Sequence, residues 1–333
     1  MTYNLSAFIP YTKHALFRED VQAVERALHS NHLTQGPEVE AFEAELCGVT
    51  GARYAVAVSS GTAALHAICA AGRGLVQMPA ISFVATANAA HAAGRDVVFV
   101  DGTPEDGSVG YDLWASIGGD LSPHPAASVL DLAHALGAPQ RFDIIGAATY
   151  SFHPAKHVTT GEGGAVCTND ADLAESCRLF RAHGRRGTEQ VAFGLNYRLP
   201  DLSAALGRSQ LTRLGWSIER RRSIAARYDE AFNAVGIETV QHSERSARHL
   251  YQLLIPNRDA VAERLKARGI GTAVHYPPIP LQPWWRKRGG YTPEQFPLAV
   301  AWSNRVLSIP LFPTLSDVEI ARVIEAVKQE CAP

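Results

Sequence analysis

The stretch from residue 54 to residue 71 constrains the fold most, because it joins a strand directly to a helix. Tyr54 to Val58 is a short apolar strand, and Ser59-Ser60-Gly61-Thr62 is a turn of small residues. An alanine-rich helix, Ala63 to Ala71, follows at once. A strand, a tight turn and a helix in this order open an α/β unit.

The alternation of strands and helices continues along the chain and predicts a mainly parallel sheet with helices on both faces. The helix over 218–232 is a natural bridge between two domains. We expect a large domain over residues 12–215 and a smaller α+β domain over 216–333. Further strands are predicted at 97–100, 128–130, 148–152, 165–168 and 251–255, and further helices at 18–28, 38–48, 201–214, 260–269 and 317–329.

Composition excludes several classes of protein. Hydrophobic residues make up 46% of the chain, charged residues make up 19%, and the formal net charge is -2, so nucleic acid is not an expected partner. The most apolar stretch, 78–100, is interrupted by Pro79 and Asn88, and the first residues lack the pattern of a signal peptide. Five scattered cysteines without a CxxC pair predict reduced thiols in the cytoplasm and no metal site.

Lys156 is the first candidate for chemistry. It follows a predicted strand and precedes the glycine cluster at 161–164. Glycines let the backbone approach a ligand closely, and a lysine that loses solvent becomes a nucleophilic amine. The alternative is an ordinary surface lysine beside a hairpin.

Asp131 is the second candidate, because it ends an apolar strand at the edge where open α/β sheets bind ligands. Its carboxylate could pair with a protonated ring nitrogen, although a helix N-cap is an open alternative. His134 would share a helical face with Asp131 if a helix starts there, or it could be a satisfied buried histidine.

Two further features suit a flat, phosphorylated ligand. Ser60-Gly61-Thr62 opens a helix, so free backbone N–H groups and the helix dipole favour a phosphate, although any serine-capped helix looks similar. Phe83 could stack on a flat ring, whereas an isolated phenylalanine is usually a core residue.

Seven segments in one order carry a family resemblance: SSGTAALH, PAISFVATANA, LDLAHALGA, SFHPAKHVTTGEGGAV, LNYRLPDLSAALGRSQL, AVHYPP and LSIPLFPTLSD. Together they resemble the DegT/DnrJ/StrS aminotransferases, the sugar aminotransferase branch of the fold-type-I pyridoxal-phosphate enzymes. The resemblance runs from Ile9 to the last helix. It implies pyridoxal 5'-phosphate (PLP) as cofactor, with a pyridoxamine 5'-phosphate form, and amino transfer from L-glutamate to a keto-sugar nucleotide.

The resemblance also implies roles for individual residues. Lys156 would carry the cofactor as a Schiff base, and Asp131 would pair with the pyridine nitrogen, which would keep its carboxylate ionised and its pKa low. The other implied cofactor contacts are His134 at the phenolic oxygen, Phe83 on the ring, and Gly61, Thr62 and Ser151 at the phosphate.

Further implied residues concern the substrate and a second subunit. Asn196 would reach the phosphate of the neighbouring subunit's cofactor, so the resemblance implies a homodimer with shared sites, and residues 1–11 would pack near the site. The residues implied to line the sugar-nucleotide cleft are His183, Arg198, His275 and Tyr276.

Within the family the chain is most similar to PseC-type enzymes, which aminate C4 of a UDP-linked 4-keto-6-deoxy-N-acetyl sugar for pseudaminic acid. Another nucleotide-linked keto-sugar (dTDP or GDP, C3 or C4) and a non-catalytic relative remain alternatives. A dehydratase of the same fold would carry histidine in place of Lys156. A nicotinamide enzyme would need a GxGxxG turn where Ser59 to Thr62 stand.

The chain also departs from the family pattern in three short connections. Residues 70–78 leave little room between a helix and a strand, residues 107–128 are compressed, and the run after Gly137 is brief. We therefore expect a trimmed large domain.

Overall fold

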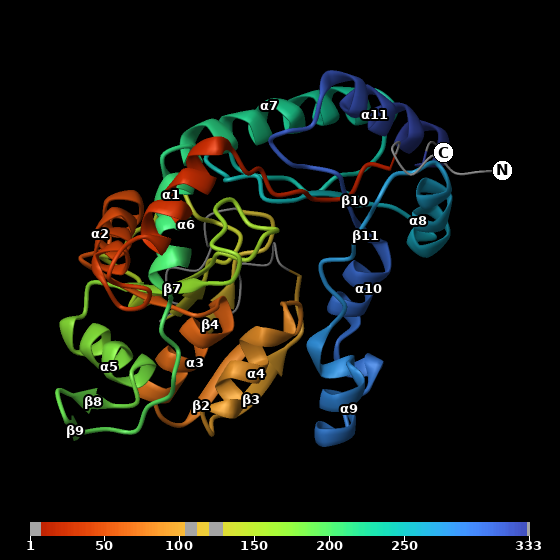
Figure 1. The fold of residues 1–333 in the computed structure, drawn as a ribbon. Helices are drawn as coiled ribbons and strands as arrows, with labels where there is room; N and C mark the ends of the chain where they lie inside the picture. Colours follow the sequence, from red (N-terminus) through yellow and green to blue (C-terminus); the bar gives the residue numbers. More distant parts are fainter. Residues whose placement is uncertain (1–7, 104–111, 120–128, 332–333) are drawn as a thin grey trace.

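The computed structural model describes residues 8–103, 112–119 and 129–331, and its elements follow the expected alternation (Figure 1). The helices are α1 (Arg18–Leu28), α2 (Pro37–Thr50), α3 (Gly61–Ala71), α4 (Val84–Ala92), α5 (Ala171–Arg181), α6 (Asp201–Leu211), α7 (Leu214–Asn233), α8 (Arg258–Ala267), α9 (Pro283–Gly289), α10 (Pro297–Arg305) and α11 (Asp317–Cys331). The strands are β1 (Tyr54–Val58), β2 (Leu75–Pro79), β3 (Asp96–Val100), β4 (Leu113–Ala115), β5 (Val129–Asp131), β6 (Ala147–Ser151), β7 (Gly164–Thr168), β8 (Arg185–Arg186), β9 (Glu189–Gln190), β10 (Tyr251–Leu254) and β11 (Val306–Ile309).

The central sheet has the strand order β1-β7-β6-β5-β4. Strands β4, β5 and β6 are parallel, while β7 runs antiparallel to both of its neighbours. Four of these five strands therefore share one direction, which confirms a mainly parallel sheet. The exception has a simple cause: only the loop 152–163 joins β6 to β7, and an antiparallel neighbour needs no crossover helix.

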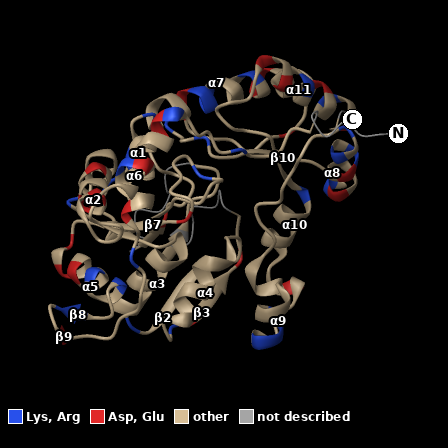
Figure 2. Ribbon diagram, in the orientation of Figure 1, with Lys and Arg blue, Asp and Glu red and all other residues tan. Residues whose placement is uncertain are grey.

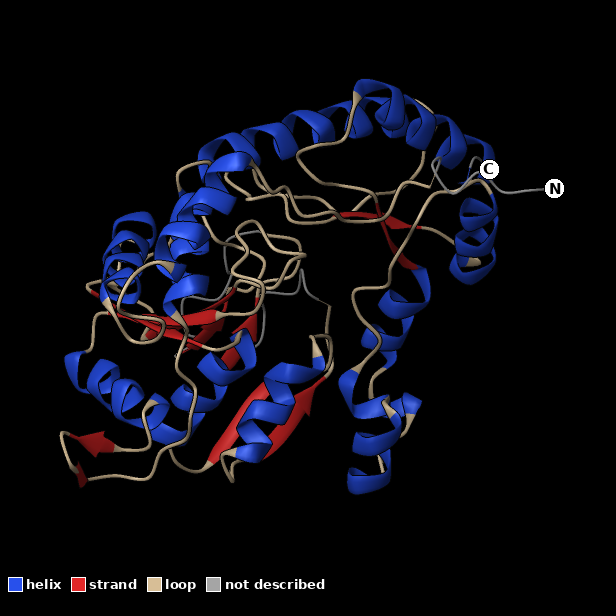
Figure 3. Ribbon diagram, in the orientation of Figure 1, coloured by secondary structure: helices blue, strands red, loops and turns tan. Residues whose placement is uncertain are grey.

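The sheet is buried on both faces, as Figure 3 shows for the helices that flank it. Along β1, Val56 and Val58 pack into an apolar cluster with residues of α3 and α5, whereas Ala55 and Ala57 pack with residues of α2 and α6. This alternation follows from the two-residue period of a strand. The apolar run from residue 54 to residue 58 is thus explained by burial on two sides.

Helix α7 contributes residues to two hydrophobic cores. Its first residues, Leu214 and Ile218, belong to the core of the large sheet. Its later residues, Tyr228 and Phe232, belong to a second core with β10, β11, α8 and α11. A third cluster combines residues 65–113 with residues 240–306, so the two parts share a broad apolar contact.

The turn after β5 corrects one expectation. Residues 132–138 form turns rather than a helix, so Asp131 is not a helix N-cap and shares no helical face with His134. The predicted short connections are partly confirmed, because only residues 72–74 separate α3 from β2. Most of the compressed region 107–128, residue 128 of the predicted strand and residues 1–7 lie outside the described residues.

The surface carries both signs of charge, mixed over the outer helices, while the strands of the central sheet contain few charged residues (Figure 2). All five cysteines are free thiols. Among residues 8–103, 112–119 and 129–331, no helix is long and apolar enough to cross a membrane.

Candidate active site

A cavity of about 470 Å³ opens at the ends of β5 and β6 and the start of α3. Its wall also includes Tyr11 and a segment near residue 275, so residues far apart in the sequence meet there. Most of the predicted site residues line it: Gly61, Thr62, Phe83, Asp131, His134, Ser151, Lys156, His275 and Tyr276.

Lys156 lies in the loop between β6 and β7, where its backbone N–H donates to the His153 carbonyl oxygen at 2.8 Å. Burial lowers the pKa of Lys156 to about 8, and the charge of Asp131 partly opposes this shift. Lys156 is partly buried and lines the cavity, which argues against the surface-lysine alternative. A large share of the amine is neutral near pH 8, and the neutral form is the nucleophile.

Asp131 is buried at the end of β5 and is held at both oxygens. The Thr86 hydroxyl donates to Oδ2 at 2.9 Å, and the Ala133 N–H donates to Oδ1 at 3.2 Å. The Ser82 hydroxyl lies 2.8 Å from the Thr86 hydroxyl, and it donates there because Thr86 donates to the carboxylate. The carboxylate is thus fixed in direction.

The pKa of Asp131 shifts in the direction opposite to the expectation. Burial raises the pKa of Asp131, although the bonds from Thr86 and Ala133 and the charge of Lys156 act in the opposite direction. The lowered pKa that we expected requires a cation at the carboxylate. Among the described residues, Lys156 supplies the one cation that acts on Asp131, and its charge does not outweigh burial.

Three buried histidines adjoin these groups. The backbone N–H of Gly118 donates to His134 Nδ1 at 3.4 Å, which leaves the proton on Nε2, 3.2 Å from the Tyr276 hydroxyl. The rings of His134 and His249 lie 4.2 Å apart between centroids. Burial lowers the pKa of all three, that of His275 to about 3, so they are neutral hydrogen-bonding groups.

The start of α3 faces the same cavity. The Ser60 hydroxyl accepts from the Ala63 N–H at 3.0 Å. No acceptor in the described part of the chain bonds the N–H groups of Gly61 and Thr62. A Cβ on Gly61 would lie 2.8 Å from the Ser151 Cβ, so glycine allows the helix start to contact β6. Two open N–H groups beside a hydroxyl suit a phosphate.

Phe83 caps the N-terminus of α4 and is 53% exposed, so it is not a core residue. Its ring centroid lies 5.7 Å from that of Tyr276 at a tilt of 46°. Both rings line the cavity, and an exposed aromatic face at this place is free to cover a flat ligand.

Three predicted residues do not line the cavity: His183, Asn196 and Arg198. Asn196 pairs with Ala182, and Arg198 pairs with Val58, in short antiparallel bridges. This segment follows α5 and passes the end of β1. Their roles in binding stay predictions.

Two groups at the site were missed by sequence reasoning: Thr86, which is buried behind Asp131, and His249, which lines the cavity. Thr86 lies on α4, three residues after Phe83, and this helical spacing is a signal that could have placed it at the site. His249 lies in an irregular segment without a motif, and only the fold brings it to His134.

Comparisons with known proteins agree with this geometry. The family model described as the DegT/DnrJ/EryC1/StrS aminotransferase family matches residues 15–113 and 123–328. The spore coat polysaccharide biosynthesis protein SpsC of Bacillus subtilis is 33% identical, over 98% of each chain.

Solved structures show the same fold. Helicobacter pylori PseC, an aminotransferase involved in the biosynthesis of pseudoaminic acid, is 27% identical with a TM-score of 0.89 over 97% of this chain and 99% of that chain. The putative sugar aminotransferase Spr1654 of Streptococcus pneumoniae in its PLP form is 24% identical, with a TM-score of 0.87 over 97% and 98% of the two chains. The protein described here therefore belongs to the DegT/DnrJ/EryC1/StrS family and is a PLP-dependent aminotransferase.

Proposed function

We propose that this enzyme moves an amino group from L-glutamate to a keto-sugar nucleotide. The observation that carries the proposal is that the Lys156 amine and the Asp131 carboxylate line one cavity. We further propose C4 of a UDP-4-keto-6-deoxy-N-acetyl-hexosamine, in a pathway of the pseudaminic-acid type, as the acceptor. The similarity to PseC and the polysaccharide role in the name of SpsC support this choice.

The residues present fit PLP. The open N–H groups of Gly61 and Thr62, with Ser151, would hold the phosphate. The fixed carboxylate of Asp131, which lines the same cavity, would face the ring nitrogen. Further contacts would come from Phe83 on the ring face and from His134 at the phenolic oxygen.

Bound PLP supplies an electron sink for the pair left when the Cα–H bond of the donor breaks. Lys156 would have two tasks: its neutral amine would hold the cofactor, and the same amine would carry the proton away from the donor carbon. Burial supports both tasks, because it lowers the pKa of Lys156 to about 8. Asp131 stabilises positive charge at the ring nitrogen, and Thr86 keeps that carboxylate aimed.

His134 and Tyr276 would orient the ligand that binds beside them in the cavity. Because the Gly118 N–H fixes the His134 proton on Nε2, that nitrogen can donate to an oxygen, and the Tyr276 hydroxyl lies within reach. We propose that the sugar nucleotide contacts His275 and Tyr276 in the cavity wall.

We propose a homodimer in which Asn196 of one subunit reaches the cofactor phosphate of the other. The same arrangement would bring His183 and Arg198 to the partner's sugar-nucleotide cleft. Two separate cores joined by α7 support the division at residues 215 and 216. Five free thiols support a reducing, cytoplasmic location.

Absorbance spectroscopy tests the function. The purified holoenzyme should show a cofactor band that bleaches with L-glutamate and returns when a keto-sugar nucleotide is added. A panel of UDP, dTDP and GDP keto-sugars, with the keto group at C3 or C4, identifies the acceptor by the fastest return. A protein that binds PLP but never bleaches would instead be a non-catalytic relative.

A further inference from the structure

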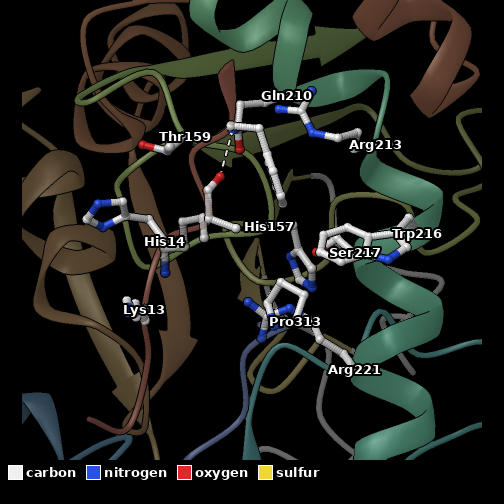
Figure 4. A pocket seen from close by; sticks show the side chains of 13 residues that line it. Lys13, His14, His157, Thr159, Gln210, Arg213, Trp216, Ser217, Arg221 and Pro313 are labelled. Atoms are coloured by element: carbon white, nitrogen blue, oxygen red, sulfur yellow. Dashed lines mark hydrogen bonds between the residues drawn. The ribbon is translucent and has the colours of Figure 1, made fainter. Parts of the chain in front are cut away.

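A second, smaller pocket lies beside the Lys156 loop, between residues 13–17, residues 156–159 and the start of α7 (Figure 4). Its volume of about 20 Å³ has room for one or two groups the size of water. None of the described residues that line it is acidic, and six are basic: Lys13, His14, Lys156, His157, Arg213 and Arg221.

Arg221 is the unusual member of this lining. It is only 2% exposed, and its Nη1 donates to the carbonyl oxygens of Leu311 at 2.7 Å and His249 at 3.2 Å. Its Nε is buried and has no hydrogen-bond partner in the described part of the chain. Burial lowers the pKa of Arg221 to about 10, so the guanidinium is still charged at neutral pH.

The other basic groups show why Arg221 differs. Arg213 forms an ion pair with the buried carboxylate of Asp20, so its charge is balanced. His157 is neutral, since burial lowers its pKa to about 3. Arg221 has two carbonyl acceptors but no carboxylate partner among the described residues. A buried charge without a counter-charge is costly.

We propose that this pocket binds one small inorganic anion of the size of chloride. Arg221 Nε would donate a hydrogen bond to the anion, and the positive charges of Arg221 and Lys13 would attract it. The volume admits a chloride and excludes a sugar or a nucleotide. The competing occupant is a water molecule that accepts from Arg221 Nε and donates to His157 Nδ1, which also has no partner among described residues. A water would satisfy both atoms but would leave the charge of Arg221 unbalanced.

Bromide identifies the occupant directly. Crystals of the holoenzyme soaked in sodium bromide should show an anomalous difference peak in this pocket, within hydrogen-bonding distance of Arg221 Nε. A pocket that holds only water in the same crystals overturns the proposal.

Solution measurements test the binding without crystals. Melting temperatures of the holoenzyme are compared in sodium chloride and in sodium gluconate at constant ionic strength, because gluconate is too large for the pocket. We expect a saturable rise of a few degrees that is specific to chloride. Arg221→Lys should abolish this rise, because the shorter side chain removes Nε.

A second variant keeps the test decisive if Arg221→Lys does not fold. Lys13 is exposed at the edge of the pocket, so Lys13→Ala should leave the fold intact and weaken chloride binding severalfold. Lys287→Ala, an exposed lysine on α9, is the matched control and should bind chloride like the unmodified chain. Equal melting in both salts, or a chloride effect unchanged in both pocket variants, overturns the proposal.

Discussion

The cavity wall and the segment 182–198 differ in whether the residues of one chain meet in one site. In the wall, Lys156 and Asp131 line one space, with hydrogen bonds that fix the carboxylate. In the segment, Asn196 and Arg198 bridge neighbouring backbone and do not line that space. The comparison indicates that one chain brings together the residues proposed to move the proton and to face the ring nitrogen, whereas the roles proposed for the segment require a second copy.

The largest effect on activity is expected from a substitution of Lys156 in the cavity wall. Lys156→Ala should abolish transamination and leave PLP bound without a covalent link, because no other described lysine lines the cavity. Borohydride reduction followed by peptide mass mapping should find the cofactor on Lys156 in the unmodified chain only. Lys266→Ala on α8 serves as the control, and normal turnover by Lys156→Ala would refute the mechanism.

Asp131→Asn should lower kcat by roughly 100-fold or more, because it removes the charge that faces the ring nitrogen. The amide oxygen can still accept from Thr86, so the fold should be kept. Single-turnover bleaching with L-glutamate measures the effect at the chemical step. A rate within twofold of the unmodified enzyme would place the ring nitrogen elsewhere.

Thr86→Val sharpens the same comparison, since it keeps the shape but removes the donor to Asp131 Oδ2. Losing a hydrogen bond to a charged group should reduce kcat about 10-fold or more. Thr86→Ser retains the hydroxyl and should stay near full activity. If both variants behave alike, the hydroxyl has no role in positioning.

The pH dependence of PLP uptake tests the environment of Lys156. Its pKa is lowered to about 8, and the neutral amine that attacks the aldehyde predominates above that value. The rate at which apoprotein forms the Schiff base should therefore rise about tenfold from pH 7 to pH 9 and then level off. A rate that keeps rising towards pH 10.5 would indicate an ordinary, solvated lysine.

Mixed dimers test the segment 182–198. The Lys156→Ala chain and the Asn196→Ala chain should each be defective when purified alone. The two chains are then mixed, unfolded and refolded together. If the sites are shared, half of the dimers contain one intact site, so activity recovers to about a quarter of the unmodified level. No recovery, with Asn196→Ala still defective by itself, would place both residues at the same chain's site.

The sequence predicted the cavity wall well because its residues lie in local patterns. Asp131 ends a strand and Lys156 lies in the loop after one, and both were identified before the structure showed that they line one cavity. Thr86 was missed although its helical spacing from Phe83 was a usable signal. His249 was missed because only the tertiary fold brings it to His134, which lies far away in sequence. The reversed direction of β7 was also missed, because hydrophobic periodicity does not define strand direction.

A structure of the holoenzyme tests the central claim most directly. We expect density continuous from Lys156 Nζ to the cofactor, with the ring nitrogen at hydrogen-bonding distance from Asp131 and the phosphate at the N–H groups of Gly61 and Thr62. Cofactor attached to another lysine, or a ring nitrogen remote from Asp131, would contradict the account.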